Sequence, residues 1–213
     1  MAASDLPSLG ERIREERVSR GVSLRTLAAQ VGVSASMISQ IETGKSQPSV
    51  STLYAITSAL GVSIQEVFDA ALRDAQAPSR VVVGESTPPT TVLQALGSSR
   101  GRRIGPVVHA EDRQTLILDT GVIWERLGEL PPHSVDFLLV TYPPGGTSAS
   151  AGGLMRHPGT EFGYIISGSL TLTLGFEEIA LAAGDSISFE STTPHSYRNE
   201  GAEPCVGVWF VVE

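Results

Sequence analysis

The chain has 213 residues, of which 18% are charged and 41% belong to the hydrophobic set. This composition is typical of a packed globular protein with one large domain or two small ones. Its apolar runs fall short of the roughly 20 residues that a membrane-spanning helix needs, and we expect no signal peptide and no membrane partner. The single cysteine, Cys205, excludes an internal disulfide, so we expect a cytoplasmic protein.

The net charge of −8 is concentrated in the C-terminal part of the chain. Residues 1–77 carry seven Lys and Arg against eight Asp and Glu, a net −1. Residues 78–213 carry eight against fifteen, a net −7. A nucleic-acid partner therefore has to meet a local basic surface within the nearly neutral N-terminal part.

Residues 6–70 predict short helices joined by tight turns. Apolar side chains recur at three- and four-residue spacing, as in helices that share a core. Serine N-caps are predicted to begin helices and glycines to end them. The serines are Ser23, Ser34 and Ser49, and the glycines are Gly21, Gly32, Gly44 and Gly61.

The third predicted helix, residues 34–43, carries small polar side chains opposite Ile38 and Ile41. Small side chains let a helix approach base edges closely, and a glutamine such as Gln40 pairs with adenine through two hydrogen bonds. An ordinary amphipathic helix with a hydrated outer face shows the same pattern. Spacing alone leaves both interpretations open.

Residues 23–60 resemble the helix-turn-helix of the phage-repressor (Cro/CI, or XRE) type. The resemblance implies that the helix of residues 34–43 enters the major groove of double-stranded operator DNA. Met37 in this helix is expected to be partly buried. The resemblance rests on Leu27-Ala28, Gly32-Val33-Ser34, Ile38 to Glu42, Gly44-Lys45, Pro48 and Leu53. The base-facing residues that it implies are Ser34, Ala35, Ser36 and Gln40, and the phosphate-facing ones are Arg25 and Lys45.

The texture of the sequence changes after about residue 72. Residues 73–106 contain several Pro, Gly and Ser and predict a linker, with one short strand at 81–83 and a solvated basic loop at 97–103. The predicted organisation is therefore a helical DNA-binding domain at 1–72, this linker, and a second domain at 107–213.

From residue 107 the pattern is one of short strands and turns. Leucines alternate with threonines over residues 170–174, which is the two-residue period of a half-buried strand. Many short strands within about a hundred residues favour a sandwich or a small barrel. The predicted strands are residues 116–118, 121–124, 137–140, 162–166, 170–174, 186–189 and 206–212.

His157, Glu161 and His195 are candidate metal ligands. His157 and Glu161 lie four residues apart across a Pro-Gly bend, and His195 follows beside Pro194. Two histidines and a carboxylate can form the facial triad of a non-haem iron site. Any chain with four histidines contains such a triple, so the spacing also fits three unrelated side chains.

Residues 156–168 and 184–199 are similar to the two motifs of the cupin family. The matching residues are His157, Glu161 and Gly168 in the first motif and Gly184, His195 and Asn199 in the second. Met155 stands where the first motif has a further histidine, so at most three of four family ligands remain. The resemblance implies an α+β two-domain chain, with an all-α helix-turn-helix bundle followed by a cupin (double-stranded β-helix, jelly-roll) barrel.

The cupin resemblance also implies a ligand site inside the barrel. His157 and Glu161 are expected to project from one strand and His195 from another, around one divalent ion (Zn, Ni, Fe or Mn) or around an empty site weakened by Met155. The aromatic residues expected to line the barrel and contact a ligand are Tyr142, Tyr164, Phe189, Tyr197 and Trp209.

The order of the domains resembles that of bacterial regulators in which the cupin binds an effector and dimerises. We therefore expect a sequence-specific DNA-binding homodimer that responds to a small-molecule effector and is not an enzyme. One alternative is an iron enzyme similar to the fosfomycin-forming epoxidase, which iron-dependent oxygen consumption would reveal. The other is a metal-free module whose cupin only dimerises the protein, which would leave DNA binding insensitive to ligands.

Overall fold

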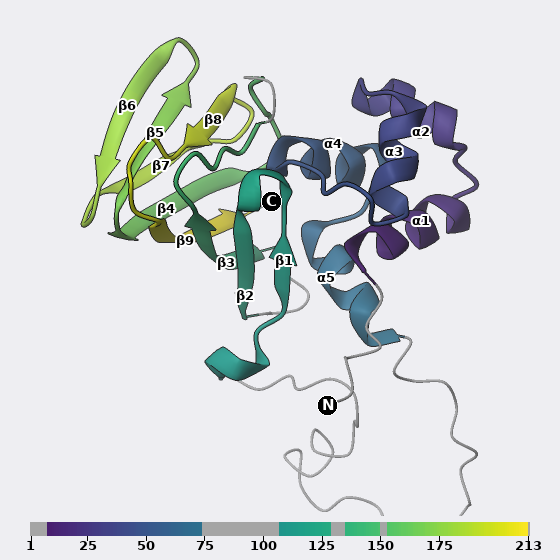
Figure 1. The fold of residues 1–213 in the computed structure, drawn as a ribbon, viewed down its shortest axis with the longest axis horizontal. Coiled ribbons are helices and arrows are strands. Elements are labelled where there is room, and N and C mark those ends of the chain that lie inside the picture. The colour runs from purple at the N-terminus through teal and green to yellow at the C-terminus, as the bar shows by residue number, and fades with distance from the viewer. Residues whose placement is uncertain (1–7, 74–106, 129–134, 150–152, 213) are drawn as a thin grey trace, which may run out of the picture.

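The computed structural model describes residues 8–73, 107–128, 135–149 and 153–212 (Figure 1). The linker proposed at 73–106, with its strand at 81–83 and its basic loop, lies outside the described residues from residue 74 onward. In the part that is described, no helix has the length and apolarity needed to cross a bilayer.

The N-terminal domain is a helical bundle, as predicted. A serine precedes each of the first four helices, and its hydroxyl accepts a hydrogen bond from the backbone N–H three residues later. Gly32 and Gly61 end helices in the left-handed conformation, with φ of 79° and 64°. The helices are α1 (Leu9–Ser19), α2 (Leu24–Val31), α3 (Ala35–Glu42), α4 (Val50–Leu60) and α5 (Ile64–Arg73).

Helix α3 is held in the bundle on both of its flanks. Ile38 is fully buried, as are Leu27 of α2 and Leu53 of α4. Gly10 of α1 lies so close to α3 that a Cβ atom there would be 2.0 Å from the carbonyl oxygen of Ile41. The backbones of α1 and α3 therefore touch, which fixes the position of α3.

The C-terminal domain consists of two antiparallel sheets (Figure 1). Within the described residues, one sheet has the order β1-β2-β3-β9-β4-β7 and the other has the order β6-β5-β8. Strands β6 and β8 were not predicted. The strands are β1 (Thr115–Ile117), β2 (Ile123–Gly128), β3 (Val135–Tyr142), β4 (Thr160–Ser167), β5 (Ser169–Leu174), β6 (Glu177–Ala182), β7 (Ser186–Glu190), β8 (His195–Arg198) and β9 (Cys205–Val212).

The larger sheet has an inner face toward the barrel interior and an outer face that is also apolar. Side chains alternate along β4 and β9, so Glu161 and Trp209 are buried while Phe162 and Phe210 are exposed. Phe137 and Phe162 both pair with Phe210, and the Phe137 and Phe210 rings stack with centroids 4.3 Å apart. We call this surface the outer sheet face, and it comprises Phe137, Leu139, Phe162, Tyr164, Ile166, Val208, Phe210 and Val212.

Helices α4 and α5 rest against the β domain (Figure 1). The backbone N–H of Ser51, at the start of α4, donates to the carbonyl of Ser148 at 2.9 Å. On α5, the carbonyl of Phe68 accepts from Gln114 Nε2 at 3.3 Å, and the Arg126 guanidinium lies 5.8 Å from the centroid of the Phe68 ring. The two domains therefore share a packed interface in which the helical side is formed by α4 and α5.

Candidate metal and ligand site

His157, Glu161 and His195 meet inside the β domain. Glu161 is the second residue of β4, and His195 is the first residue of β8. The expectation that His157 lies on the same strand as Glu161 is wrong, because β4 begins only at Thr160. His157 lies in the preceding segment, whose backbone pairs with the 191–195 region through Met155–His195 and His157–Ser191 hydrogen bonds. This pairing brings the two imidazoles together.

The three side chains converge on one point. His157 Nε2 is 3.4 Å and His195 Nε2 is 3.3 Å from the same oxygen, Glu161 Oε2. Their exposed fractions are 4% for His157, 3% for Glu161 and 0% for His195. Three donor atoms for a metal thus face one another out of contact with water.

Backbone carbonyls hold both imidazoles with Nε2 toward Glu161. His157 Nδ1 lies 3.1 Å from the carbonyl of Pro158, and His195 Nδ1 lies 2.8 Å from the carbonyl of Thr193. Since a carbonyl only accepts, each Nδ1 carries the proton and donates it. In the neutral imidazoles, both Nε2 lone pairs then point toward Glu161, the arrangement that metal-binding histidines adopt.

The other oxygen of Glu161 is held by two donors. Oε1 accepts from the Tyr197 hydroxyl at 2.6 Å and from Trp209 Nε1 at 2.9 Å. Burial opposes ionisation of Glu161, but the neighbouring His157, His195 and Tyr197 side chains outweigh burial and lower the pKa to about 2. Burial and the Glu161 charge raise the pKa of Tyr197, which therefore keeps the proton that it donates. Glu161 is consequently a carboxylate at neutral pH.

A divalent cation fits this arrangement. Among the described residues, Glu161 Oε2 and both Nε2 atoms are buried without a hydrogen-bond partner. A buried carboxylate and two converging lone pairs are costly unless a cation or protons lie between them. His157, Glu161 and His195 would hold the ion, and a bound ion would supply open coordination positions for a further ligand.

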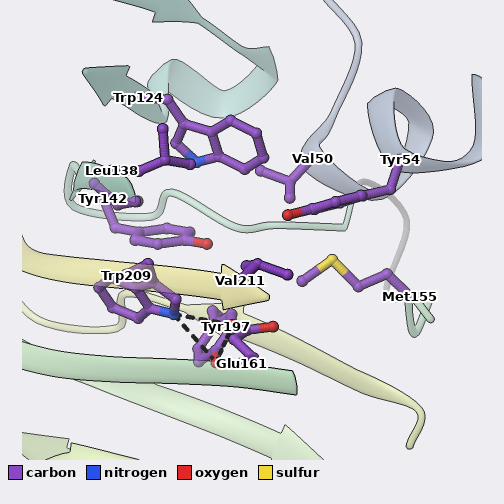
Figure 2. A pocket seen from close by; sticks show the side chains of 11 residues that line it. Val50, Tyr54, Trp124, Leu138, Tyr142, Met155, Glu161, Tyr197, Trp209 and Val211 are labelled. Carbon is purple, nitrogen blue, oxygen red and sulfur yellow. Dashed lines mark hydrogen bonds between the residues drawn. The ribbon is translucent and has the colours of Figure 1, made fainter. Parts of the chain in front are cut away.

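A small cavity adjoins the triad (Figure 2). Its free space is about 20 Å³, room for about one water molecule. Its wall is mostly apolar and includes Glu161 and Met155, the residue at the position of the missing histidine. The full lining is Val50, Tyr54, Trp124, Leu138, Val140, Tyr142, Met155, Glu161, Tyr197, Trp209 and Val211.

The aromatic residues expected in the barrel fall into three groups. Tyr142, Tyr197 and Trp209 line the cavity. Phe189 does not line it but packs edge-on against His195, with ring centroids 4.9 Å apart. The expectation that Tyr164 lines the barrel is wrong: Tyr164 is 50% exposed on the outer sheet face, because Gly163 and Ile165 take the inward positions of β4.

The residues expected to meet DNA lie at or near the solvent side of α2 and α3. Ser36, Gln40, Arg25 and Lys45 are exposed. Ser34 is the N-cap of α3, and its hydroxyl accepts from the backbone N–H of Met37 at 3.1 Å. A further residue, Ala35, is only partly exposed and packs against the core.

Two other residues of this region show how its helices pack. Met37 is 42% exposed and thus partly buried, as expected, while the fully buried positions of α3 fall at Ile38 and Ile41. Glu42 belongs to the helix-turn-helix resemblance but is buried and ion-paired with Arg17. Glu42 therefore supports the fold and does not face DNA.

Comparisons with known proteins agree with this architecture. A helix-turn-helix family model matches residues 13–67, and a cupin domain model matches residues 138–211. The HTH-type transcriptional regulator PuuR of Escherichia coli is 28% identical over 196 residues, which cover 92% of this chain and 90% of the relative. The chain is a helix-turn-helix transcription regulator with a cupin domain.

Two further comparisons extend along the whole regulator. The HTH-type transcriptional regulator SutR of Escherichia coli is 24% identical over 92% of this chain and 89% of its own length. The crystal structure of an HTH_3 family transcriptional regulator from Vibrio cholerae superposes with a TM-score of 0.60 at 22% identity, covering 96% of this chain and 94% of that one. This last likeness concerns the fold.

Sequence reasoning missed one part of the regulator's cavity wall. Val50 and Tyr54 belong to α4 of the DNA-binding domain but line the cavity in the β domain (Figure 2). They lie one helical turn apart, on a different side of α4 from Leu53 and Ile56. The sequence contained one signal of this contact: α4 has a second apolar stripe in addition to the stripe that faces the helical core.

Proposed function

We propose that the regulator binds operator DNA as a homodimer in the cytoplasm and that a small-molecule effector, bound at a divalent-metal site in the cupin barrel, changes this binding. The observation that carries the proposal is the convergence of Glu161 Oε2 with the Nε2 atoms of His157 and His195, all buried and without hydrogen-bond partners among the described residues. Zn, Ni, Fe or Mn would satisfy these atoms.

The carbonyl contacts of the imidazoles support the metal assignment. Each Nδ1–H donates a hydrogen bond to a backbone carbonyl, so the Nε2 lone pairs of the neutral rings are available to an ion. In the alternative without metal, an imidazolium pairs with Glu161 and the cluster titrates as a unit. In both cases a polar cluster lies at the end of an apolar cavity, which is the usual form of a small-molecule site.

The outer sheet face supports the homodimer. Exposed apolar residues that are scattered singly over a surface need no explanation, but a contiguous apolar patch usually marks an interaction site. The residues of the outer sheet face are contiguous, because they lie side by side on paired strands. One short helix α3 reads few base pairs, so a two-fold operator with half-sites about 34 Å apart requires two copies. Pairing of the outer sheet face with the same face of a second copy would meet that requirement.

We also propose that the regulator does not catalyse a reaction. Two observations support this proposal. The chain matches two transcription regulators over nearly their whole length, and the exposed side of α3 is polar, which an enzyme does not need. Oxygen consumption by the iron-loaded protein would contradict it.

The metal site is tested by titrating chelator-treated protein with Zn²⁺, Ni²⁺, Fe²⁺ and Mn²⁺ in a calorimeter. We expect one ion per chain for the wild type and loss of at least about 100-fold in affinity for His195→Ala and Glu161→Gln, since each removes a donor atom. The matched control is His109→Ala, which removes an exposed histidine away from the site. Equal binding by all four proteins would contradict the site.

The response to effector is tested on DNA. Candidate small molecules are screened for a change in affinity for a duplex from the regulator's own promoter. His157→Ala and His195→Ala are expected to lose the response while keeping most of the DNA affinity measured without effector. If both respond like the wild type, the cluster is not the sensor.

A further inference from the structure

Helix α4 serves two neighbours at once. It packs against α2, and Leu53 and Ile56 are fully buried. Val50 and Tyr54 instead line the cavity beside Glu161, and Figure 2 shows both side chains reaching it from the helical domain. The DNA-binding domain thus supplies part of the wall of the proposed ligand site.

Tyr54 stacks directly on a proposed metal ligand. The rings of Tyr54 and His157 have centroids 3.9 Å apart and planes inclined by only 4°. Tyr54 is buried, and its ring also meets Trp124 edge-on at 5.8 Å. The stacking fixes the plane of the imidazole whose Nε2 faces Glu161. A partner that orients a ligand in this way influences metal affinity without touching the ion.

Tyr54 also lines two cavities. On the barrel side lies the space of about 20 Å³ described above. On the other side lies a cleft of about 270 Å³ between the domains. Tyr54 lines both cavities, and its stacking partner His157 also lines the cleft. The cleft is lined by Tyr54, Thr57, Ser58, Gly61, Val62, Ser63, Ile64, His157 and Pro158.

We propose that Tyr54 is a positioning residue of the metal site and that it transmits the loading of this site to the DNA-binding domain. The inference rests on the proposed metal site. A metal ion held by His157 Nε2 would draw charge from the imidazole ring, and this would change the surface on which Tyr54 packs. Tyr54 belongs to the same helix as Leu53 and Ile56, so α4 carries this change into the bundle that holds α3. Coupling of this kind is reciprocal, so operator DNA must change metal affinity by the same factor.

The experiment compares the full-length wild type with Tyr54→Phe, Tyr54→Leu and Ser58→Ala. Tyr54→Phe keeps the stacked ring, and Tyr54→Leu keeps apolar bulk without it. Ser58→Ala changes an exposed residue on the same helix that does not stack. For each protein, Zn²⁺ affinity is measured by calorimetry, and affinity for a promoter duplex is measured by fluorescence anisotropy with and without saturating Zn²⁺.

In the wild type, Zn²⁺ is expected to change the dissociation constant for the duplex by at least about 5-fold. Tyr54→Phe and Ser58→Ala should keep this change. Tyr54→Leu should lose most of it and bind Zn²⁺ about 10-fold or more weakly. Hydrogen exchange of residues 50–60 in the wild type provides a readout without substitution, and their protection should change when Zn²⁺ is added.

Three results would overturn the inference. If Tyr54→Leu binds Zn²⁺ and responds to it like the wild type, Tyr54 does not transmit loading, and the metal site stands. If the wild type binds Zn²⁺ but shows neither the change in DNA affinity nor the change in exchange, the coupling is absent, and the metal site again stands. If the wild type binds none of the four metals, the proposed function fails, and the inference fails with it.

Discussion

Single residues in the DNA-binding domain divide into those that hold the fold and those that face solvent. Arg17 and Glu42 are both buried and form two parallel hydrogen bonds of 2.6 and 2.9 Å, and Arg17 Nη1 also donates to the carbonyl of Val22. Gln40, two residues before Glu42, is exposed on α3. Neighbouring positions of one motif therefore have different physical roles, so a substitution at Glu42 should affect stability and a substitution at Gln40 should affect DNA binding.

Glu42→Gln should destabilise the domain. Removing one charge of a buried pair leaves the Arg17 guanidinium without its counter-ion, which costs roughly 3–5 kcal/mol. The measurement is urea unfolding followed by circular dichroism. The matched control is Glu16→Gln, which breaks a more exposed pair with Arg20 and should cost at most about 1 kcal/mol. Equal effects of the two substitutions would refute the structural role of Glu42.

Gln40→Ala and Lys45→Ala should weaken DNA binding in different ways. Gln40→Ala should lose about 1–3 kcal/mol at one base position of the operator and little on other sequences. Lys45→Ala should weaken all sequences similarly and reduce the salt slope of binding by about one. Anisotropy titrations on operator and random duplexes at several salt concentrations distinguish the two. A uniform loss for Gln40→Ala would rule out base reading by this residue.

At the scale of elements, local sequence predicted most of the fold. The helices could be predicted because serine caps, glycine stops and apolar spacing are all encoded within a few residues of each boundary. Strand β6 begins with Glu177 and Glu178 and is exposed at five of its six positions, so it shows no alternation of apolar and polar residues. Strand β8 has only four residues, and Tyr197 is the one among them with a large apolar surface. The strand is defined by its pairing with β5, which no local pattern encodes.

The candidate site was predicted only in part, for the same reason. The three ligands could be named from the cupin motifs, but the inward or outward direction of Tyr164 depends on the register of β4 within the sheet. The contribution of Tyr54 depends on how the two domains pack, because a second apolar stripe on α4 indicates that this side is covered but not which residues cover it.

Gly10→Ala tests how α1 holds the recognition helix. The new methyl group would meet the Ile41 carbonyl oxygen at 2.0 Å, so α1 and α3 have to separate. We expect a loss of about 1–3 kcal/mol in the free energy of unfolding, together with weaker operator binding, because α3 shifts. The control is Ser19→Ala, on the exposed end of α1. Unchanged unfolding and DNA affinity would show that α3 does not depend on this contact.

At the scale of the whole molecule, the two surfaces proposed to contact partners lie on different domains. The solvent side of α3 lies in the helical domain, and the outer sheet face lies on β3, β9 and β4 of the other domain. The site between them contacts both domains through Tyr54. The proposed dimer face and the proposed DNA-contacting face are therefore separate, so substitutions can test them one at a time.

Phe210→Asp should convert the proposed dimer into a monomer. Phe210 stacks on Phe137 in the centre of the outer sheet face, where a carboxylate would be desolvated on association. Sedimentation velocity should show the monomer, and operator affinity should fall steeply since two half-sites are no longer bound together. Phe176→Asp is the matched control, because Phe176 is fully exposed in the turn between β5 and β6. A dimer that survives Phe210→Asp would place the interface elsewhere.

The two-sided packing of α4 limits how such regulators can be recombined. Ser36 and Gln40, two of the proposed base-facing residues, are exposed and line neither the cavity nor the cleft, so exchanging them should change the operator without disturbing the barrel. In a chimaera that joins a foreign DNA-binding domain to this cupin within residues 74–106, the barrel would face a foreign α4 that lacks Tyr54 and Val50. Such a hybrid would keep its ligands for a metal yet lose the wall that encloses them. Under the proposed function, DNA specificity is transferable within this architecture, whereas the proposed sensor can be inherited only together with α4, which supplies part of its wall.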